Sequence, residues 1–246
     1  MMGVMEPGTI LTLGARNLGG AILDHFLARG WRAAAVARSA DTLQQVRDRG
    51  ALAVEADASD PGELDRAIGA VQDEHGDVDV IVNAVSASRP PQSGGPWGGG
   101  PIADGTTDGV RGWTVAVAEQ AFAFLSTGAR ALREQGHGGT LVQVTGGSSR
   151  RAMPNRGMWA AGAFATRALT QAAAQELRAE GIHVALLIVD ATIESPKTEQ
   201  MTAGRAREEL ADMARIAEAV EFLAAQDLRA YTHELVLTPA GDQWVP

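Results

Sequence analysis

The residues best suited to bind a ligand come directly after the first apolar run of the chain. Residues 9–13 read TILTL, and residues 14–20 read GARNLGG and lead into a segment with helical spacing. Where a glycine-rich turn joins a strand to a helix, the exposed N–H groups of the turn and the helix dipole both favour an anion. The segment therefore predicts a phosphate site, with a tight turn that binds no ligand as the alternative.

A second segment with useful chemistry spans residues 145–156 and reads TGGSSRRAMPNR. It places three hydroxyls, Ser148 among them, next to three arginines. Guanidinium groups bind carboxylates and phosphates well. The segment therefore suggests a small-molecule substrate with an anionic group, and a solvated loop is the alternative interpretation.

Two carboxylates, Asp190 and Glu194, follow the apolar run at residues 183–189. Either could act as an acid or base if burial raised its pKa. Each could instead cap or satisfy a turn. The five histidines are isolated in the sequence, so we expect no metal site. A GxSxG nucleophile elbow is absent as well.

Positioning these groups requires a regular scaffold, and short apolar runs alternate with longer helical segments along the chain. The predicted strands are residues 9–13, 33–37, 51–55, 78–83, 140–145, 183–189 and 234–237. The predicted helices are residues 18–29, 41–49, 61–74, 110–135, 158–180 and 205–225. Most of the strand segments are apolar throughout, which is typical of a parallel sheet covered on both faces. The pattern predicts an α/β protein with a single-domain Rossmann fold: a doubly wound parallel sheet of about seven strands flanked by helices.

One segment, residues 86–109, interrupts this alternation inside the single domain predicted for residues 1–246. It is rich in proline and glycine and has no periodicity. A loop of this length is uncommon within a compact domain. It follows the fourth predicted strand, at the sheet edge where such folds bind ligands. We interpret it as a substrate or lid loop, with simple disorder as the alternative.

Composition excludes several classes of function. The net charge of −9 argues against a general affinity for nucleic acid or anionic membranes. The absence of cysteine excludes disulfides, thiolate metal ligands and a cysteine nucleophile. We see no signal peptide and no run approaching the ~20 apolar residues of a membrane span. The expectation is a cytoplasmic protein.

The chain resembles the short-chain dehydrogenase/reductase family, whose glycine motif reads TGxxxGxG. Gly14 and Gly20 match the first and last glycines of that motif, Leu18 stands at the middle one, and Gly19 comes one residue late. Residues 139–145 look like the family's fifth strand. The resemblance extends over nearly the whole chain and implies a nicotinamide dinucleotide cofactor and an oxidoreductase activity.

The resemblance also implies which residues contact the cofactor. NADP-binding members often carry a basic residue at the position of Arg38, so NADP(H) is favoured over NAD(H), and a solvated arginine is the alternative. Asp57 and Ala58 match positions beside the adenine, although Asp57 could be an ordinary turn residue. Asn83 matches the first residue of the family's NNAG motif and is expected to hold backbone around the cofactor. The full implied set is Gly14, Arg16, Asn17, Leu18, Gly19, Gly20, Arg38, Asp57, Ala58 and Asn83.

In the same register, the family's catalytic residues are missing. Its tyrosine and lysine positions fall on Trp159 and Ala163, its serine position on Gly146 and its asparagine position on Gln120. An indole N–H is a hydrogen-bond donor without a proton acidic enough for general acid catalysis. The sequence therefore argues against carbonyl reduction by the family's standard mechanism. The candidate substitutes are Asp190, Glu194 and Ser148.

Three functions remain open. The first, which we favour, is an NADP(H)-dependent oxidoreductase with a non-standard active site. The second is a non-catalytic NADP(H)-binding sensor or an inactive partner in a complex. The third is a non-redox enzyme, of isomerase or dehydratase type, built on the same scaffold. The long helices predicted at residues 110–135 and 158–180 match the family's assembly surface, so we expect a homodimer or homotetramer.

Overall fold

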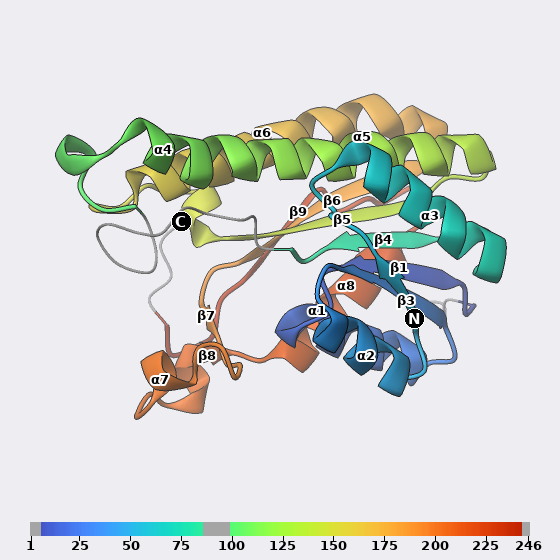
Figure 1. Cartoon of the computed structure of the whole chain (residues 1–246), viewed down its shortest axis with the longest axis horizontal. Helices are drawn as coiled ribbons and strands as arrows, with labels where there is room; N and C mark the ends of the chain where they lie inside the picture. Colours follow the sequence, from blue (N-terminus) through green and yellow to red (C-terminus); the bar gives the residue numbers. More distant parts are fainter. Residues whose placement is uncertain (1–5, 86–98, 243–246) are drawn as a thin grey trace.

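A parallel sheet of seven strands forms the centre of the protein (Figure 1). The computed structural model describes residues 6–85 and 99–242. The strands follow the order β3-β2-β1-β4-β5-β6-β9 across the sheet. Their bounds are β1 Thr9–Leu13, β2 Arg32–Ala37, β3 Leu52–Glu55, β4 Val80–Asn83, β5 Gly139–Gly146, β6 Ile182–Val189 and β9 Glu234–Leu237. The order reverses between β1 and β4, which confirms the predicted doubly wound Rossmann fold.

Helices cover both faces of the sheet (Figure 1). One face carries α1 (Asn17–Leu27), α2 (Ala40–Asp48) and α8 (Met213–Ala224). The other carries α3 (Pro61–His75), α5 (Ala116–Gln135) and α6 (Gly157–Leu177). None of the helices in the described ranges is long and apolar enough to cross a membrane.

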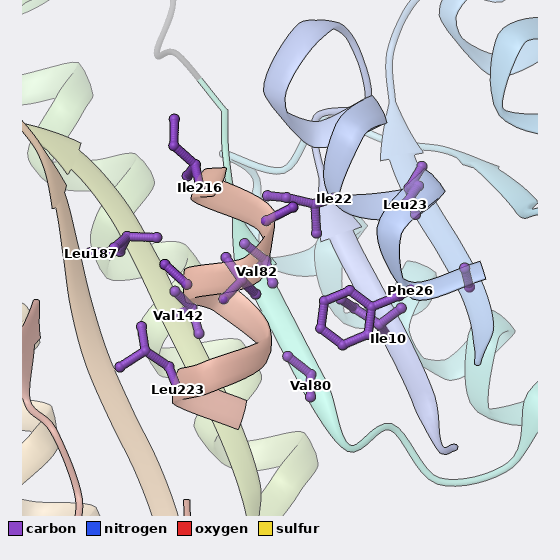
Figure 2. Packing of buried hydrophobic residues seen from close by; sticks show 14 of the residues in the cluster. Ile10, Ile22, Leu23, Phe26, Val80, Val82, Val142, Leu187, Ile216 and Leu223 are labelled. Atoms are coloured by element: carbon purple, nitrogen blue, oxygen red, sulfur yellow. The ribbon is translucent and has the colours of Figure 1, made fainter. Parts of the chain in front are cut away.

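Each face of the sheet has its own apolar core, because successive strand residues point in opposite directions. In β1, for example, Ile10 belongs to the core beneath α1 and α8, whereas Leu11 belongs to the core beneath α3 and α5. Figure 2 shows the first core, where Phe26 of α1 lies near Ile10 and Leu223 of α8 lies near the strands. Burial of side chains of this size contributes about 1.5–3 kcal/mol each. This packing fixes α1, and with it the glycine-rich turn, against the sheet.

Two helices begin where the sequence offers a capping side chain. The Ser39 hydroxyl accepts a hydrogen bond from the Thr42 N–H at the start of α2, at 3.3 Å. The Asp60 carboxylate accepts from the Glu63 N–H at the start of α3, at 2.8 Å, and Pro61 occupies the first helical position. Both caps satisfy N–H groups that have no partner within the helix.

The helix predicted at residues 205–225 starts eight positions later, at Met213. The preceding residues form a 3₁₀ turn, Arg207–Glu209, and a short strand, β8 (Leu210–Ala211). This strand pairs with β7 (Thr192–Ile193) in a two-stranded ribbon. Helical spacing does not reveal such a pairing, because the partner strand lies far away in sequence. The Asp212 carboxylate, which accepts from the Ala214 N–H at 2.7 Å, marks the true start of the helix.

The helix predicted at residues 110–135 is present, but it is not α-helical throughout. It consists of α4 (Thr107–Val110), a π-helical segment, Arg111–Val115, and α5. The π-helical segment packs against Gly162 of α6, where a Cβ would collide with the carbonyl oxygen of Trp113. Segments of this type often lie at functional sites. Residues 86–98 of the predicted lid loop lie outside the described residues, and the remainder of that loop contains a 3₁₀ turn, Ile102–Asp104, and the start of α4.

We predict that Gly162→Ala lowers the free energy of unfolding by up to about 2 kcal/mol. The added methyl overpacks the contact with the π-helical segment at a cost of about 1–3 kcal/mol, and the better helix propensity of alanine offsets about 1 kcal/mol of this cost. Gly69→Ala in α3 is the matched control, because its added Cβ would meet nothing within 4 Å. The control should gain up to about 1 kcal/mol in urea unfolding followed by circular dichroism. Equal shifts in the two variants would contradict the close packing.

Candidate functional site

A cavity of about 1010 Å³ runs along the carboxyl edge of the sheet. Its walls come from the glycine-rich turn, from the ends of β2, β5 and β6, from α5 and α6, and from the segment that follows β6. In a doubly wound sheet this edge, at the point where the strand order reverses, is the usual place for a ligand. The cavity therefore lies where the sequence predicts a dinucleotide.

The predicted cofactor residues of the glycine-rich turn differ in whether they line the cavity. Gly14, Arg16, Asn17 and Leu18 line the cavity, whereas Gly19 and Gly20 do not. Gly14 has a φ of +80°, which favours glycine. A Cβ on Gly19 would collide with the carbonyl oxygen of Gly14. Gly19 thus permits the tight turn itself.

The glycine-rich turn leads into α1, whose N-terminus has no side-chain cap. Its N-cap residue, Arg16, makes no capping hydrogen bond, and the first turn of the helix contains no acidic residue. N–H groups and the positive end of the helix dipole are therefore available to an anion. Together with the absence of a Cβ at Gly14 and Gly19, this fits the phosphates of a dinucleotide.

Arg38 and Asp57 meet in the wall formed by the ends of β2 and β3. The Arg38 Nη1 lies 3.2 Å from the Asp57 Oδ2. The Asp57 carboxylate also accepts hydrogen bonds from the Ser59 N–H and hydroxyl, at 2.9 and 2.5 Å. Partial burial opposes ionisation, but the Ser59 hydrogen bonds and the charge of Arg38 outweigh it and lower the pKa of Asp57. Ala58 lines the cavity beside this pair, and the Arg38 side chain remains 60% exposed.

Asn83 lies behind the cavity wall and does not line it. Its fully buried side chain bonds to Gln120 of α5 and Gln143 of β5, which do line the cavity. The Asn83 Oδ1 also accepts from the Val85 N–H, at 3.2 Å. Asn83 therefore holds neighbouring groups in place from behind the wall.

Trp159 and Ala163 of α6 line the same cavity, together with Gly146 and Ser148. The Trp159 indole stacks on the buried indole of Trp113, with ring centroids 5.3 Å apart and planes inclined by 29°. Trp113 belongs to the π-helical segment, which packs closely against α6 because Gly162 has no side chain. The sequence-predicted catalytic positions are thus brought together with the glycine-rich turn in one cavity.

Tyr231, the sole tyrosine, does not line this cavity. Its ring stacks on His183 near the amino end of β6, with centroids 4.2 Å apart and planes inclined by 4°. Burial lowers the pKa of His183 and raises that of Tyr231. The phenol therefore lies at the edge of the sheet opposite the cavity.

The two carboxylates proposed as substitute acids differ in position. Asp190 lines the cavity, but Arg151 binds it in bidentate fashion, with Nη–Oδ distances of 2.6 and 3.0 Å. Gly147 makes room for this pair, because a Cβ there would collide with the Asp190 carboxylate. Glu194 is exposed, and it is not among the residues that line the cavity. Arg151, predicted as part of an anion site, is therefore engaged with a carboxylate of the protein.

The segment after β6 contributes residues that the sequence did not single out for the site. Lys197, Thr198, Met201 and Arg205 line the cavity from the region between β7 and β8. Lys197 is the only lysine of the chain, and this was the one feature of the sequence that could have drawn attention to the segment. Within residues 6–85 and 99–242, no three histidine, aspartate or glutamate side chains gather as metal ligands would.

The chain matches the short chain dehydrogenase family over residues 9–205, and it belongs to this oxidoreductase family. It is 29% identical over 245 residues to a 2-(R)-hydroxypropyl-CoM dehydrogenase of Xanthobacter autotrophicus, covering 91% of this chain and 93% of that protein.

Solved structures share the fold. An alcohol dehydrogenase of Thermococcus sibiricus, complexed with 5-hydroxy-NADP, has a TM-score of 0.78 at 21% identity and covers 98% of this chain and 100% of its own. A gluconate 5-dehydrogenase of Burkholderia cenocepacia, in complex with NADP and tartrate, has a TM-score of 0.79 at 18% identity. The match covers 96% of this chain and 95% of that protein's chain.

We predict that Arg151→Met lowers the free energy of unfolding by about 3 kcal/mol, because the 8% exposed Asp190 side chain loses its counter-charge. The matched control is Arg111→Met, which removes an arginine from a pair whose side chains are 71% and 82% exposed. Exposed pairs contribute at most about 1 kcal/mol. Urea unfolding measures both changes, and a loss no greater in Arg151→Met than in the control would show that the cavity pair is not buried in solution.

Proposed function

We propose that the protein is an NADP(H)-dependent oxidoreductase whose active site differs from that of its family. One observation carries this proposal: a single cavity joins the turn at residues 14–18, where the start of α1 has no side-chain cap, to a wall that contains Trp159 and Ala163. The first part fits the phosphates of the cofactor. The second part stands where the resemblance places the family's tyrosine and lysine.

Arg38 supports NADP(H) over NAD(H). Its guanidinium lies at the end of β2, beside the cavity, and remains largely exposed. A guanidinium matches a phosphate in charge and in hydrogen-bond geometry. Asp57, held by Ser59 and Arg38, keeps that guanidinium beside the cavity. We therefore assign the 2′-phosphate of the cofactor to Arg38, with Arg16 as a second cation on the glycine-rich turn.

The cofactor supplies the hydride when it is bound, and the chain must orient the substrate and provide for the proton. Trp159 can donate a hydrogen bond through its indole N–H but cannot deliver a proton at neutral pH. A positioned general acid contributes about 10²–10⁴ in rate. We therefore expect carbonyl reduction to be slow unless the substrate accepts its proton from a group other than residue 159.

The non-catalytic alternative has one observation in its favour. Trp159 is packed on Trp113 at the position of the missing acid, so the wall is closed by a stable aromatic pair. Tight NADPH binding without turnover of a panel of ketones and alcohols would select this alternative. The non-redox alternative has less support, because Asp190 is bound to Arg151 and Glu194 does not line the cavity.

The substrate side of the cavity carries cations. Arg156 and Lys197 line it, and neither has a side-chain partner among the described residues. We infer that the substrate is a small molecule with an anionic group, and that the protein acts in the cytoplasm. Phe122 of α5 and Phe164 of α6 are 57% and 43% exposed, which supports a homodimer or homotetramer formed through these helices.

We predict that Arg38→Leu weakens NADPH binding at least tenfold while leaving NADH binding nearly unchanged, since only NADPH carries the phosphate that Arg38 would contact. The matched control is Arg32→Leu, which removes an exposed arginine from the other end of β2. Fluorescence titration measures both affinities. A parallel loss for the two cofactors would assign Arg38 a structural role, and failure of the unaltered protein to bind either cofactor would refute the proposed function.

We predict that the double variant Trp159→Tyr/Ala163→Lys accelerates NADPH-dependent ketone reduction by about 10²–10⁴, because it supplies a general acid in an otherwise suitable cavity. Trp159→Phe/Ala163→Lys is the control that differs only by the phenolic hydroxyl. Loss of NADPH absorbance is a suitable assay. Equal rates for the two double variants would show that residue 159 does not stand at the proton-donating position.

A further inference from the structure

Three buried amide side chains form a hydrogen-bonded cluster at the wall of the cavity. Asn83 comes from β4, Gln120 from α5 and Gln143 from β5, and their exposed fractions are 0%, 3% and 3%. Figure 1 shows α5 lying across the face of the sheet that contains β4 and β5. A buried amide without hydrogen-bond partners is costly, so each N–H and each oxygen of this cluster needs a partner.

Asn83 and Gln120 are bound reciprocally. The Asn83 Nδ2 donates to the Gln120 Oε1 at 3.2 Å, and the Gln120 Nε2 donates back to the Asn83 Oδ1 at 2.9 Å. The Asn83 Nδ2 also donates to the Gln143 Oε1 at 2.8 Å, and the Gln143 Nε2 donates to the Val144 carbonyl at 2.8 Å. Both glutamine amides are thereby fixed in orientation.

The count of donors leaves one N–H on each glutamine. An amide nitrogen carries two hydrogens; Gln120 uses one of them toward Asn83, and Gln143 uses one toward the Val144 carbonyl. In the part of the chain that the structure describes, no acceptor takes the second hydrogen. Both glutamines line the cavity, whereas Asn83, which orients them, does not. The two remaining donors are therefore available to a ligand in the cavity.

The position in the sheet indicates which part of a dinucleotide these donors would meet. Each half of a doubly wound sheet takes one mononucleotide. The half formed by β1, β2 and β3 carries Gly14, Arg38 and Asp57, which suit the phosphates and the adenosine. Gln143 belongs to the other half, formed by β4, β5 and β6. The amide cluster thus lies on the nicotinamide side.

We propose that Gln120 and Gln143, held by Asn83, donate hydrogen bonds to an oxygen of the nicotinamide mononucleotide half of the cofactor. The oxygen is a ribose hydroxyl or the carboxamide oxygen. Asn83 is a positioning residue in this arrangement. The inference rests on the proposed cofactor binding. The two glutamines supply neutral donors in a chain whose Trp159 and Ala163 offer no phenol and no ammonium group on this side.

The test is a set of titrations on folded protein with NADP⁺, with thionicotinamide-NADP⁺ and with 2′,5′-ADP, which lacks the nicotinamide half. Gln120→Leu and Gln143→Leu each remove one donor, and in either variant both polar atoms of Asn83 keep a partner. Gln135→Leu is the matched control: it lies at the far end of α5, where its amide bonds to Val78 and Gln72.

Each cluster variant should weaken NADP⁺ binding about three- to tenfold, the effect of one neutral hydrogen bond, and leave 2′,5′-ADP binding unchanged. The control should alter neither. A smaller loss with thionicotinamide-NADP⁺ identifies the carboxamide oxygen, because sulfur is a weak acceptor, and an equal loss identifies the ribose. Unchanged NADP⁺ binding, or an equal loss for 2′,5′-ADP, overturns the inference although the cofactor binds. If the unaltered protein binds none of the three, the proposed function has failed.

Discussion

The structure depends on how the start of α1 is held at the point where the strand order reverses. Phe26 and Ile22 bury one face of the helix against β1 and α8, so its N-terminus cannot turn away from the cavity. The absence of a Cβ at Gly19 allows the turn to close. The N–H groups at this helix start have no capping side chain, and an anion is the ligand that satisfies them best. The helix packing on the sheet thus defines where a phosphate can bind.

The opposite wall is stabilised by pairing within the protein. Arg151 and Asp190 neutralise each other beside the cavity, and Trp113 and Trp159 stack. A buried carboxylate with a bidentate arginine gains little by exchanging that partner for a substrate. Arg151 and Asp190 are therefore committed to structure, and Asp190 is not free to serve as the acid or base of a reaction.

The sequence predicts the sheet well and its interruptions poorly. All seven strands of the main sheet appear as apolar runs, and Asp60 followed by Pro61 marks the start of α3. The β7–β8 ribbon is invisible to periodicity, since it needs a partner 18 residues away and contains two residues per strand. The Arg151–Asp190 pair joins residues 39 positions apart, and spacing cannot reveal it. Only Gly147, which leaves room for the carboxylate, hints at it.

The amide cluster shows what a site gains and loses when it relies on neutral donors. An ammonium group offers strong attraction, but its charge depends on burial and on its neighbours. The amides of Gln120 and Gln143 do not titrate, and Asn83 fixes them before any ligand arrives. Preorganised neutral donors cost little reorganisation on binding. They cannot relay a proton, however. In the proposed function these amides would hold the nicotinamide nucleotide, and the proton of the reaction would have to come from another group.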